Sequence, residues 1–284
     1  TKSSSALCVD LANSLIAHKN LFNQSETLYR KALELNPEYT DAWNNLGNLY
    51  RVHLSRYEES EQAYRRAIEI NPESDYAWNN LGGLYQDRLS RYKESEQAYH
   101  RAIEINPENE YAWNGLGDLY QDYLSRYEES EQAHRRAIEL NSEYTDAWNS
   151  LGSLYQCYLS RYEEAEQAHR RAIEINPENE LAWNSLGDLY QFNFSRYEES
   201  EQAYRRAIEI NSEDDYAWNN LGNLYRVHLS RYEESEQAYR RAIELNPENT
   251  AAWNSLGGIY QDHLSRYEES EQAYRRAIEI NPEY

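Results

Sequence analysis

The sequence predicts an all-α solenoid built from tandem helical hairpins. Three observations lead to this fold class. Seven tryptophans follow one another at intervals of 35 residues, from Trp43 to Trp253, and a period of this length is typical of repeat architectures. Each interval contains two stretches in which apolar residues recur at steps of three and four, which gives a helix one apolar face. An Asn-Pro pair ends most of the intervals, and proline there disfavours a continuing helix.

The period divides the chain into eight tandem units. They run over residues 6–40, 41–75, 76–110, 111–145, 146–180, 181–215, 216–250 and 251–284. The first unit is degenerate, because Cys8 and Ala12 replace a tryptophan and a glycine that the other units share. Since one hairpin buries its apolar face only against its neighbours, we expect residues 1–284 to form a single solenoid.

Two apolar stripes in each unit predict two helices. In the second unit the stripe of the first helix comprises Trp43, Leu46, Leu49, Tyr50 and Leu54. The stripe of the second helix comprises Tyr57, Ser60, Tyr64, Ala67 and Ile68. Both follow the three- and four-residue spacing of an amphipathic helix.

The start of the second helix carries a capping signal. Ser55 followed by Glu58 predicts a capping box, in which a hydroxyl and a carboxylate satisfy two unpaired amides. The same pair recurs as Ser125/Glu128, Ser160/Glu163, Ser195/Glu198, Ser230/Glu233 and Ser265/Glu268.

The end of the second helix is expected at Asn71-Pro72. Ser142 and Ser212 replace the proline in two units, so we expect tertiary packing to end the helix there. The first helix of the next unit needs an N-cap with a short polar side chain. The sequence predicts these caps at Thr40, Asp75, Asn109 and Thr145.

A glycine recurs inside the first helix, where it costs about 1 kcal/mol relative to alanine. We expect a close approach of the second helix at this point, because glycine has no β-carbon. Ala63 and Ala67 would supply similarly small surfaces. The glycines are Gly47, Gly82, Gly117, Gly152, Gly187, Gly222 and Gly257.

Composition excludes several kinds of partner. The chain has 28 basic and 50 acidic residues and a net charge of −22, which repels a polyphosphate backbone, so nucleic acid is not expected. No apolar run reaches the length of about 18 residues that crosses a bilayer, so no membrane partner is expected. No cluster of His, Cys or carboxylates stands apart from the repeat. We therefore expect no metal, no cofactor and no enzyme activity.

The two cysteines indicate a reducing compartment. Cys8 and Cys157 fall in the first and fifth units, too far apart in a solenoid for a disulfide. No signal peptide is recognisable. Together these features favour a cytoplasmic location.

The order of residues in the unit resembles the tetratricopeptide repeat. The resemblance covers nearly the whole chain in seven well-formed copies, and it implies a right-handed superhelix that acts as a protein-interaction scaffold. It rests on Trp43, Leu46-Gly47, Tyr50, Tyr57 to Ser60, Tyr64, Ala67 and Asn71-Pro72.

This sequence departs from the family pattern in two ways. The unit is one residue longer than the usual 34, with the addition between Val52 and Ser55, where the family has a glycine turn. The small residue expected at Ser60 is alanine only at Ala165. The added residue would lengthen the first helix or reshape the turn.

Differences between the near-identical copies indicate a binding surface. Most lie in the first helix, whereas Glu61 and Arg65 of the second helix hardly change and predict a solvated outer face. In the family that the chain resembles, this face of the first helix lines a concave groove that receives peptides. The variable registers begin at Asp41, Asn45, Asn48, Val52 and His53.

One register of this face is invariant and holds asparagine. Two interpretations remain: the amides pair with the backbone of a bound peptide, or each bridges to the neighbouring repeat. The asparagines of this register are Asn44, Asn79, Asn114, Asn149, Asn184, Asn219 and Asn254.

Acidic and tyrosine side chains on the same face favour a peptide that carries lysine or arginine. The family's basic clamp for acidic tails looks absent, because only Arg51 and Arg226 lie nearby. The expected groove residues are Tyr76, Tyr111, Tyr216, Asp87, Asp118, Asp122, Asp188 and Asp262.

Two functions are consistent with this sequence. The first is a protein-interaction scaffold that holds an extended peptide or a helix in the groove of the first helices. The second is a structural protein whose repeats stack head to tail into a filament or larger array. The last unit favours the second function, because it keeps its Tyr and Ile stripe without a polar capping helix.

Overall fold

The computed structural model describes residues 3–19 and 21–282, and this part contains sixteen α-helices and no strand. The predicted all-α fold of tandem hairpins is confirmed. The first helices of the hairpins are α1 (Ser4–Lys19), α3 (Thr40–Asn48), α5 (Asp75–Asp87), α7 (Glu110–Asp122), α9 (Thr145–Cys157), α11 (Glu180–Asp188), α13 (Asp215–Leu224) and α15 (Thr250–Asp262). The second helices are α2 (Phe22–Leu35), α4 (Tyr57–Ile70), α6 (Tyr92–Ile105), α8 (Tyr127–Leu140), α10 (Tyr162–Ile175), α12 (Tyr197–Ile210), α14 (Tyr232–Leu245) and α16 (Tyr267–Ile280).

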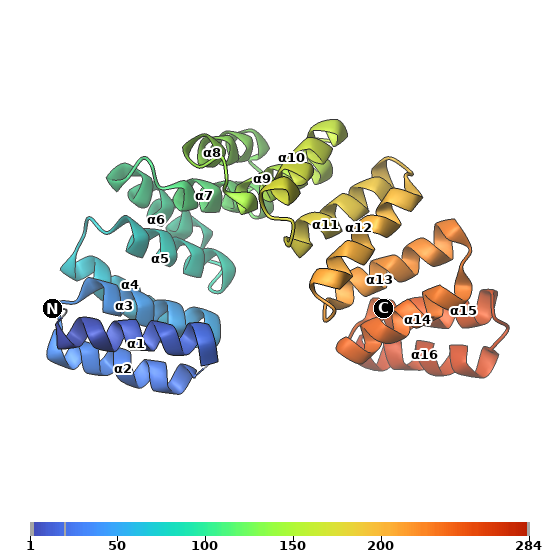
Figure 1. Ribbon diagram of the computed structural model, residues 1–284, viewed down its shortest axis with the longest axis horizontal. Helices are drawn as coiled ribbons and strands as arrows, with labels where there is room; N and C mark the ends of the chain where they lie inside the picture. The colour runs from blue at the N-terminus through green and yellow to red at the C-terminus, as the bar shows by residue number, and fades with distance from the viewer. Residues whose placement is uncertain (1–2, 20, 283–284) are drawn as a thin grey trace. The chain divides into compact units, whose positions relative to one another are not determined.

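The chain divides into two compact units, Thr1–Ser142 and Glu143–Tyr284. The first unit holds α1 to α8 and the second holds α9 to α16, and within each unit the hairpins pack in chain order (Figure 1). The first helices of neighbouring hairpins are also in contact, for example α3 with α5 and α9 with α11. A single solenoid over residues 1–284 and its right-handed twist stay predictions.

Each of the seven recurring glycines lies against an aromatic ring of the second helix in its own hairpin. A β-carbon at Gly47 would be 2.6 Å from Cε1 of Tyr64, closer than atoms pack. The hydroxyl of Ser60 donates to the carbonyl oxygen of Gly47 at 2.8 Å. The expected close approach is confirmed, and serine is common at this register because its hydroxyl joins the two helices there.

The turn after the first helix takes up the added residue of the repeat. The amide of Arg196 donates to the carbonyl of Tyr190 at 2.8 Å, six residues back, whereas an ordinary Schellman turn closes five residues back. The turns of all eight hairpins share this bond, and in the degenerate first hairpin it joins Leu21 to Leu15. In three hairpins the widened turn is π-helical, at η1 (Leu49–His53), η2 (Leu189–Asn193) and η3 (Tyr225–Leu229).

The predicted capping boxes are wrong. Ser55 lies two residues before α4 with a left-handed φ of 52°, where it closes the turn, and the N-cap Arg56 makes no side-chain capping bond. Glu59 takes over part of the capping that was expected of Ser55 and Glu58. The hydrogen bond from the Arg56 guanidinium, together with one from its own backbone amide, holds the pKa of Glu59 below its usual value. The same left-handed serine recurs at Ser125, Ser160, Ser195, Ser230 and Ser265.

One predicted N-cap of the first helices is confirmed and three are wrong by one residue. Asn109 caps α7, accepting from the amide of Ala112 at 3.0 Å. Thr40, Asp75 and Thr145 are instead the first residues of their helices. The residue before each is the cap, because that is where the chain turns from extended to helical backbone.

The turn between hairpins is fixed by the tryptophan of the next first helix. Trp183 Nε1 donates to the carbonyl of Pro177 at 3.0 Å, and Trp218 Nε1 donates to that of Ser212 at 3.2 Å. α12 ends at Ile210 although no proline follows. The helix thus ends at the expected place, and the indole bond to Ser212 is a tertiary contact at this turn.

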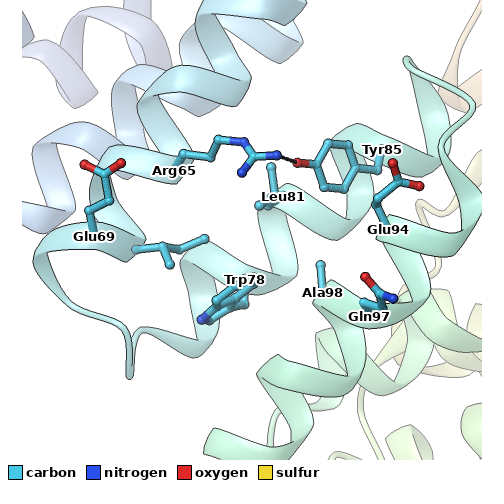
Figure 2. Close-up of a pocket in the computed structure, with 9 residues that line it drawn as sticks. Arg65, Glu69, Trp78, Leu81, Tyr85, Glu94, Gln97 and Ala98 are labelled. Carbon is cyan, nitrogen blue, oxygen red and sulfur yellow. Dashed lines mark hydrogen bonds between the residues drawn. The ribbon is translucent and has the colours of Figure 1, made fainter.

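A polar network, here named the clasp, joins successive hairpins. Glu61 of α4 accepts from the hydroxyl of Tyr85 at 2.8 Å and from Arg91 Nη1 at 3.0 Å. Arg65 also donates to the Tyr85 hydroxyl, at 2.8 Å (Figure 2). Burial raises the pKa of Glu61, but the bonds from Tyr85, Arg65 and Arg91 outweigh it and hold that pKa below its usual value. The expected solvated outer face is therefore wrong at Glu61, which lies between hairpins.

The glycine contact can be tested with two alanine substitutions in the second unit. Gly187→Ala is expected to destabilise this unit by about 1–3 kcal/mol, because its β-carbon would lie 2.6 Å from the ring of Tyr204. Gly258→Ala is the matched control, since its β-carbon would meet the Tyr274 hydroxyl only at 3.6 Å. It should be neutral or stabilise by up to about 1 kcal/mol. Urea unfolding monitored by tryptophan fluorescence measures both, and equal losses would contradict the close contact.

Candidate functional site

Among the hollows on the exposed face of the first helices, two lie at the same register, one in each unit. The first-unit hollow, of about 290 Å³, lies between α1, α3 and the start of α5. The second-unit hollow, of about 410 Å³, lies between α11 and α13. Asn44 and Tyr76 line the first, and their counterparts four repeats later, Asn184 and Tyr216, line the second.

The second-unit hollow is strongly acidic. Ten described residues line it, and none of them is a lysine or an arginine. Its carboxylates come from both helices and from the turn between the repeats. They are Glu180, Asp188, Glu213, Asp214 and Asp215.

Asp188 lies at the end of α11, where neutral donors surround its carboxylate. Its oxygens accept from the hydroxyls of Tyr204 at 2.6 Å and Tyr216 at 2.7 Å. They also accept from the amide of Asn220 at 3.0 Å. Burial raises the pKa of Asp188, and these three hydrogen bonds oppose the rise without cancelling it. Such a carboxylate costs stability, which is typical of groups kept for binding.

The asparagine register is not used in one way throughout. Asn44 Oδ1 accepts from Asn80 of the next repeat at 3.0 Å, which is the bridge that the second interpretation expects. Asn184 Nδ2 donates at 2.6 Å to Asp214, the N-cap of the next first helix. Asn79 and Asn254 are partly buried.

Two further asparagines bind a histidine within their own hairpin, and two carry an unsatisfied oxygen. His134 Nδ1 donates to Asn114 Oδ1 at 2.8 Å, and His169 Nδ1 donates to Asn149 Oδ1 at 2.9 Å. The buried Oδ1 atoms of Asn184 and Asn219 have no hydrogen-bond partner.

The three predicted tyrosines are exposed on the first-helix face. Tyr76, Tyr111 and Tyr216 expose 59%, 46% and 52% of their surface. Leu181, which lies beside Tyr216 in the second-unit hollow, is 62% exposed. The face therefore combines apolar surface with the acidic groups.

The structure brings together some of the predicted aspartates. Asp87, Asp118 and Asp122 gather around Tyr123, whose pKa is raised by burial and then by these carboxylates. Asp262 ends α15 and is exposed. It does not line the hollow that contains Asp188.

Asp214 and Leu181 are the functional candidates that the sequence analysis missed. Leu181 lies in the first variable register but was not selected as a site residue. Asp214 lies two residues before the first register compared, at the N-cap of α13. A signal was present, since this register holds serine at Ser74 and asparagine at Asn179.

His134 and His169 replace the tyrosine that lies against the first-helix glycine in other hairpins. Both are fully buried, and the Nε2 atom of each has no hydrogen-bond partner. Burial lowers the pKa of His134 to about 3 and that of His169 to about 4. Both imidazoles are therefore neutral in the folded chain at physiological pH.

A second type of hollow lies beside the clasp. Trp78, Leu81 and Ala98 line it, with Arg65 and Glu94 also at its edge (Figure 2). The same hollow recurs around Trp218 in the second unit. Because its edge carries both signs of charge, and Arg65 is already bound to Tyr85, it has no preference for one charge of ligand.

The described residues contain no group of three or more His, Cys, Asp or Glu arranged to hold a metal ion. Within the same residues, no helix is both long enough and apolar enough to cross a membrane.

Comparisons with known families and structures agree with the hairpin geometry. Models of the tetratricopeptide repeat match residues 9–75, 154–215, 189–243 and 224–284. Two further models of this repeat match residues 63–97 and 110–144. A search of curated proteins finds no match.

Several solved structures share the fold. The Cut9–Hcn1 hetero-tetramer of the APC/C matches with 18% identity over 99% of this chain and 54% of that one, at a TM-score of 0.72. PilF of Pseudomonas aeruginosa matches with 20% identity over 76% of this chain and 96% of that one, at 0.64. MamA matches with 18% identity over 59% and 95%, at 0.52. At these identities the similarity shows the fold alone, and the chain spans about half the length of the APC/C protein.

The buried histidines predict that the chain becomes less stable in acid. Each imidazole has a folded-state pKa below its unfolded value of 6.5, so the stability is complete above pH 6.5 and is lost as the pH falls. At pH 5 the loss is about 2 kcal/mol per histidine. His134→Tyr and His169→Tyr, which restore the residue of other hairpins, should each reduce it.

Urea midpoints at pH 7.5 and pH 5 measure this effect for each variant separately. The parent chain should lose more stability between the two pH values than either variant does. Identical pH profiles would show that the imidazoles are accessible to protons in the folded chain.

Proposed function

Because the chain belongs to the tetratricopeptide repeat family, we propose that it binds an extended basic segment of a partner protein along the first-helix face. The family is one of protein-interaction scaffolds and is typically non-enzymatic, which gives the general function. The observation that carries the finer proposal is the pair of hollows at the same register in both units. Each unit therefore offers a hollow of this kind to a bound segment.

Exposed aromatic side chains supply the apolar part of the binding. Tyr76 and Tyr216 each lie at a hollow and are more than half exposed. Tyrosine offers a large rigid contact area with little loss of side-chain entropy. These rings are the anchors against which a peptide would pack.

The acidic groups supply the charge preference. The chain carries a net charge of −22, and the second-unit hollow adds carboxylates without a lysine or arginine in its lining. Complementary charge speeds encounter and suppresses partners of the wrong sign. A segment rich in lysine or arginine is therefore the favoured partner.

The asparagine register supports backbone binding at fewer positions than the sequence suggested. Asn44 already accepts a hydrogen bond from the next repeat. Asn184 and Asn219 keep an oxygen without a donor, and an unmade hydrogen bond at a buried acceptor is costly. A bound donor would relieve that cost.

Binding of two peptide pools tests the proposal. Twelve-residue fluorescent peptides, one pool rich in lysine and arginine and one rich in aspartate and glutamate, share the same apolar residues. Anisotropy is expected to show at least about tenfold tighter binding of the basic pool and a loss of affinity at higher salt. Tyr216→Ala should weaken this binding, whereas Tyr267→Ala, which removes an exposed ring from α16, should not.

Equal binding of the two pools, or binding that salt leaves unchanged, would contradict the basic partner. Equal effects of Tyr216→Ala and Tyr267→Ala would contradict the first-helix face.

End-to-end stacking is a second candidate. Tyr267 and Ile278 of α16 are 66% and 54% exposed, and Leu7 and Leu11 of α1 are 56% and 51% exposed. A contact between α16 of one chain and α1 of the next would be apolar, because the degenerate first hairpin lacks the tyrosine and arginine that form the clasp in the other hairpins. Light scattering over a concentration series distinguishes the two functions, since growing particles support stacking and a constant size supports the scaffold.

A further inference from the structure

We propose that the second-unit hollow is a subsite for one arginine side chain of the bound segment. This inference rests on the proposed function and adds the chemical group and the residues that hold it. Asp188 and Asp214 would accept from the guanidinium, Tyr216 would lie against its plane, and Asn184 would supply a neutral acceptor.

Among the described residues, no lysine or arginine binds the carboxylates of Asp188 and Asp214 in the hollow. Asp188 accepts only from two phenols and an amide among the described residues. Asp214 caps α13 by accepting from the amides of Tyr216 and Ala217, and its second oxygen accepts from Asn184. These neutral donors hold the carboxylates in place but leave their charges uncompensated.

Asn184 provides an independent sign of a missing donor. Its side chain is 4% exposed and lines the hollow, and its Oδ1 has no hydrogen-bond partner. The amide is oriented by the bond from Nδ2 to Asp214 at 2.6 Å, which fixes Oδ1 as the remaining acceptor. A ligand with several donors would satisfy this atom and the carboxylates together.

Arginine fits this set better than lysine because its planar guanidinium carries five donors and stacks on aromatic rings. The chain itself shows the arrangement in the clasp. The guanidinium carbon of Arg231 lies 4.3 Å from the centre of the Tyr225 ring while its Nη1 donates to Glu201 at 3.0 Å. The hollow offers the same two partners, an exposed tyrosine ring and carboxylates.

The first-unit hollow is a built-in comparison. Asn48 and Ser74 occupy the registers of Asp188 and Asp214, so two charges are missing. Asn48 accepts from the Tyr64 hydroxyl at 2.6 Å, as Asp188 accepts from Tyr204. The tyrosine bond at this register is thus shared by both units, although Asn48 lines a neighbouring hollow between α1 and α3 and not the first-unit hollow itself.

The subsite is tested on the whole chain with single amino-acid probes. N-acetyl-arginine amide is titrated against the ¹⁵N-labelled chain, and the side-chain amide signals of Asn184 and Asn220 are followed. N-acetyl-lysine amide and N-acetyl-citrulline amide are the comparisons. We expect saturable shifts with the arginine probe, at least fivefold weaker binding of the lysine probe and no saturation with the neutral citrulline probe.

Matched variants separate the subsite from net charge. Asp188→Asn should weaken binding of the arginine probe at least fivefold. It should fold, because Asn48 and Asn223 accept from tyrosine at the same register. Glu244→Gln removes one carboxylate charge from the exposed surface of α14 in the same unit and should leave binding unchanged. Asn48→Asp combined with Ser74→Asp should create arginine binding in the first unit.

Equal binding of the arginine and citrulline probes, or of arginine and lysine, would overturn the subsite. So would equal effects of Asp188→Asn and Glu244→Gln. If the basic peptide pool still binds in a salt-dependent way in these cases, the proposed function stands without the subsite. If the arginine probe binds as expected but neither pool binds, the subsite stands and peptide binding fails.

Discussion

The contact between a glycine of the first helix and an aromatic ring of the second is the constraint on which the rest of the structure depends. The ring occupies the space that a β-carbon at Gly187 would need, so the two helices approach closely enough for Ser200 to bond the Gly187 carbonyl at 2.9 Å. The phenol of Tyr204 then passes between the helices, and its hydroxyl reaches Asp188 on the first-helix face. The packing of the two helices therefore also positions Asp188 of the candidate site. The glycine that costs helix stability in isolation is what places a donor beneath the hollow.

The sequence was sufficient to predict the fold because its strongest signals are periodic. The tryptophans, the glycines and the two apolar stripes each specify the same hairpin, and the structure confirms all three. Most of the errors concern single residues at helix starts, and one concerns Glu61, which was expected on a solvated face but lies between hairpins. Ser55 followed by Glu58 matches a capping box, but the added residue of the repeat places the serine in a left-handed turn two residues too early. The residue pattern alone does not reveal that the backbone of Ser55 is left-handed.

The candidate site was predictable as a face but not as a set of contacts. Comparison of the copies selected Asn184, Asp188 and Tyr216, and all three line the second-unit hollow. The pairing of Asn184 with Asp214 joins residues 30 positions apart, and it depends on how two hairpins pack. The clasp could not be predicted for the same reason. Glu61 and Arg65 also form an i,i+4 ion pair within α4, and the sequence pattern indicates only that pair. Interactions between repeats cannot be read from the period, since every copy carries the same residues.

The central claim is that partners are held on the first-helix face, and site-specific photo-crosslinking tests it most directly. A benzoylphenylalanine residue replaces Tyr76, Tyr216 or, as the control, Tyr267 in the full chain, and a biotinylated basic peptide pool is added before irradiation. The account predicts crosslinked peptide at positions 76 and 216 and little at position 267, although Tyr267 is the most exposed of the three at 66%. Crosslinking that is strongest at position 267, or equal at all three, would contradict it.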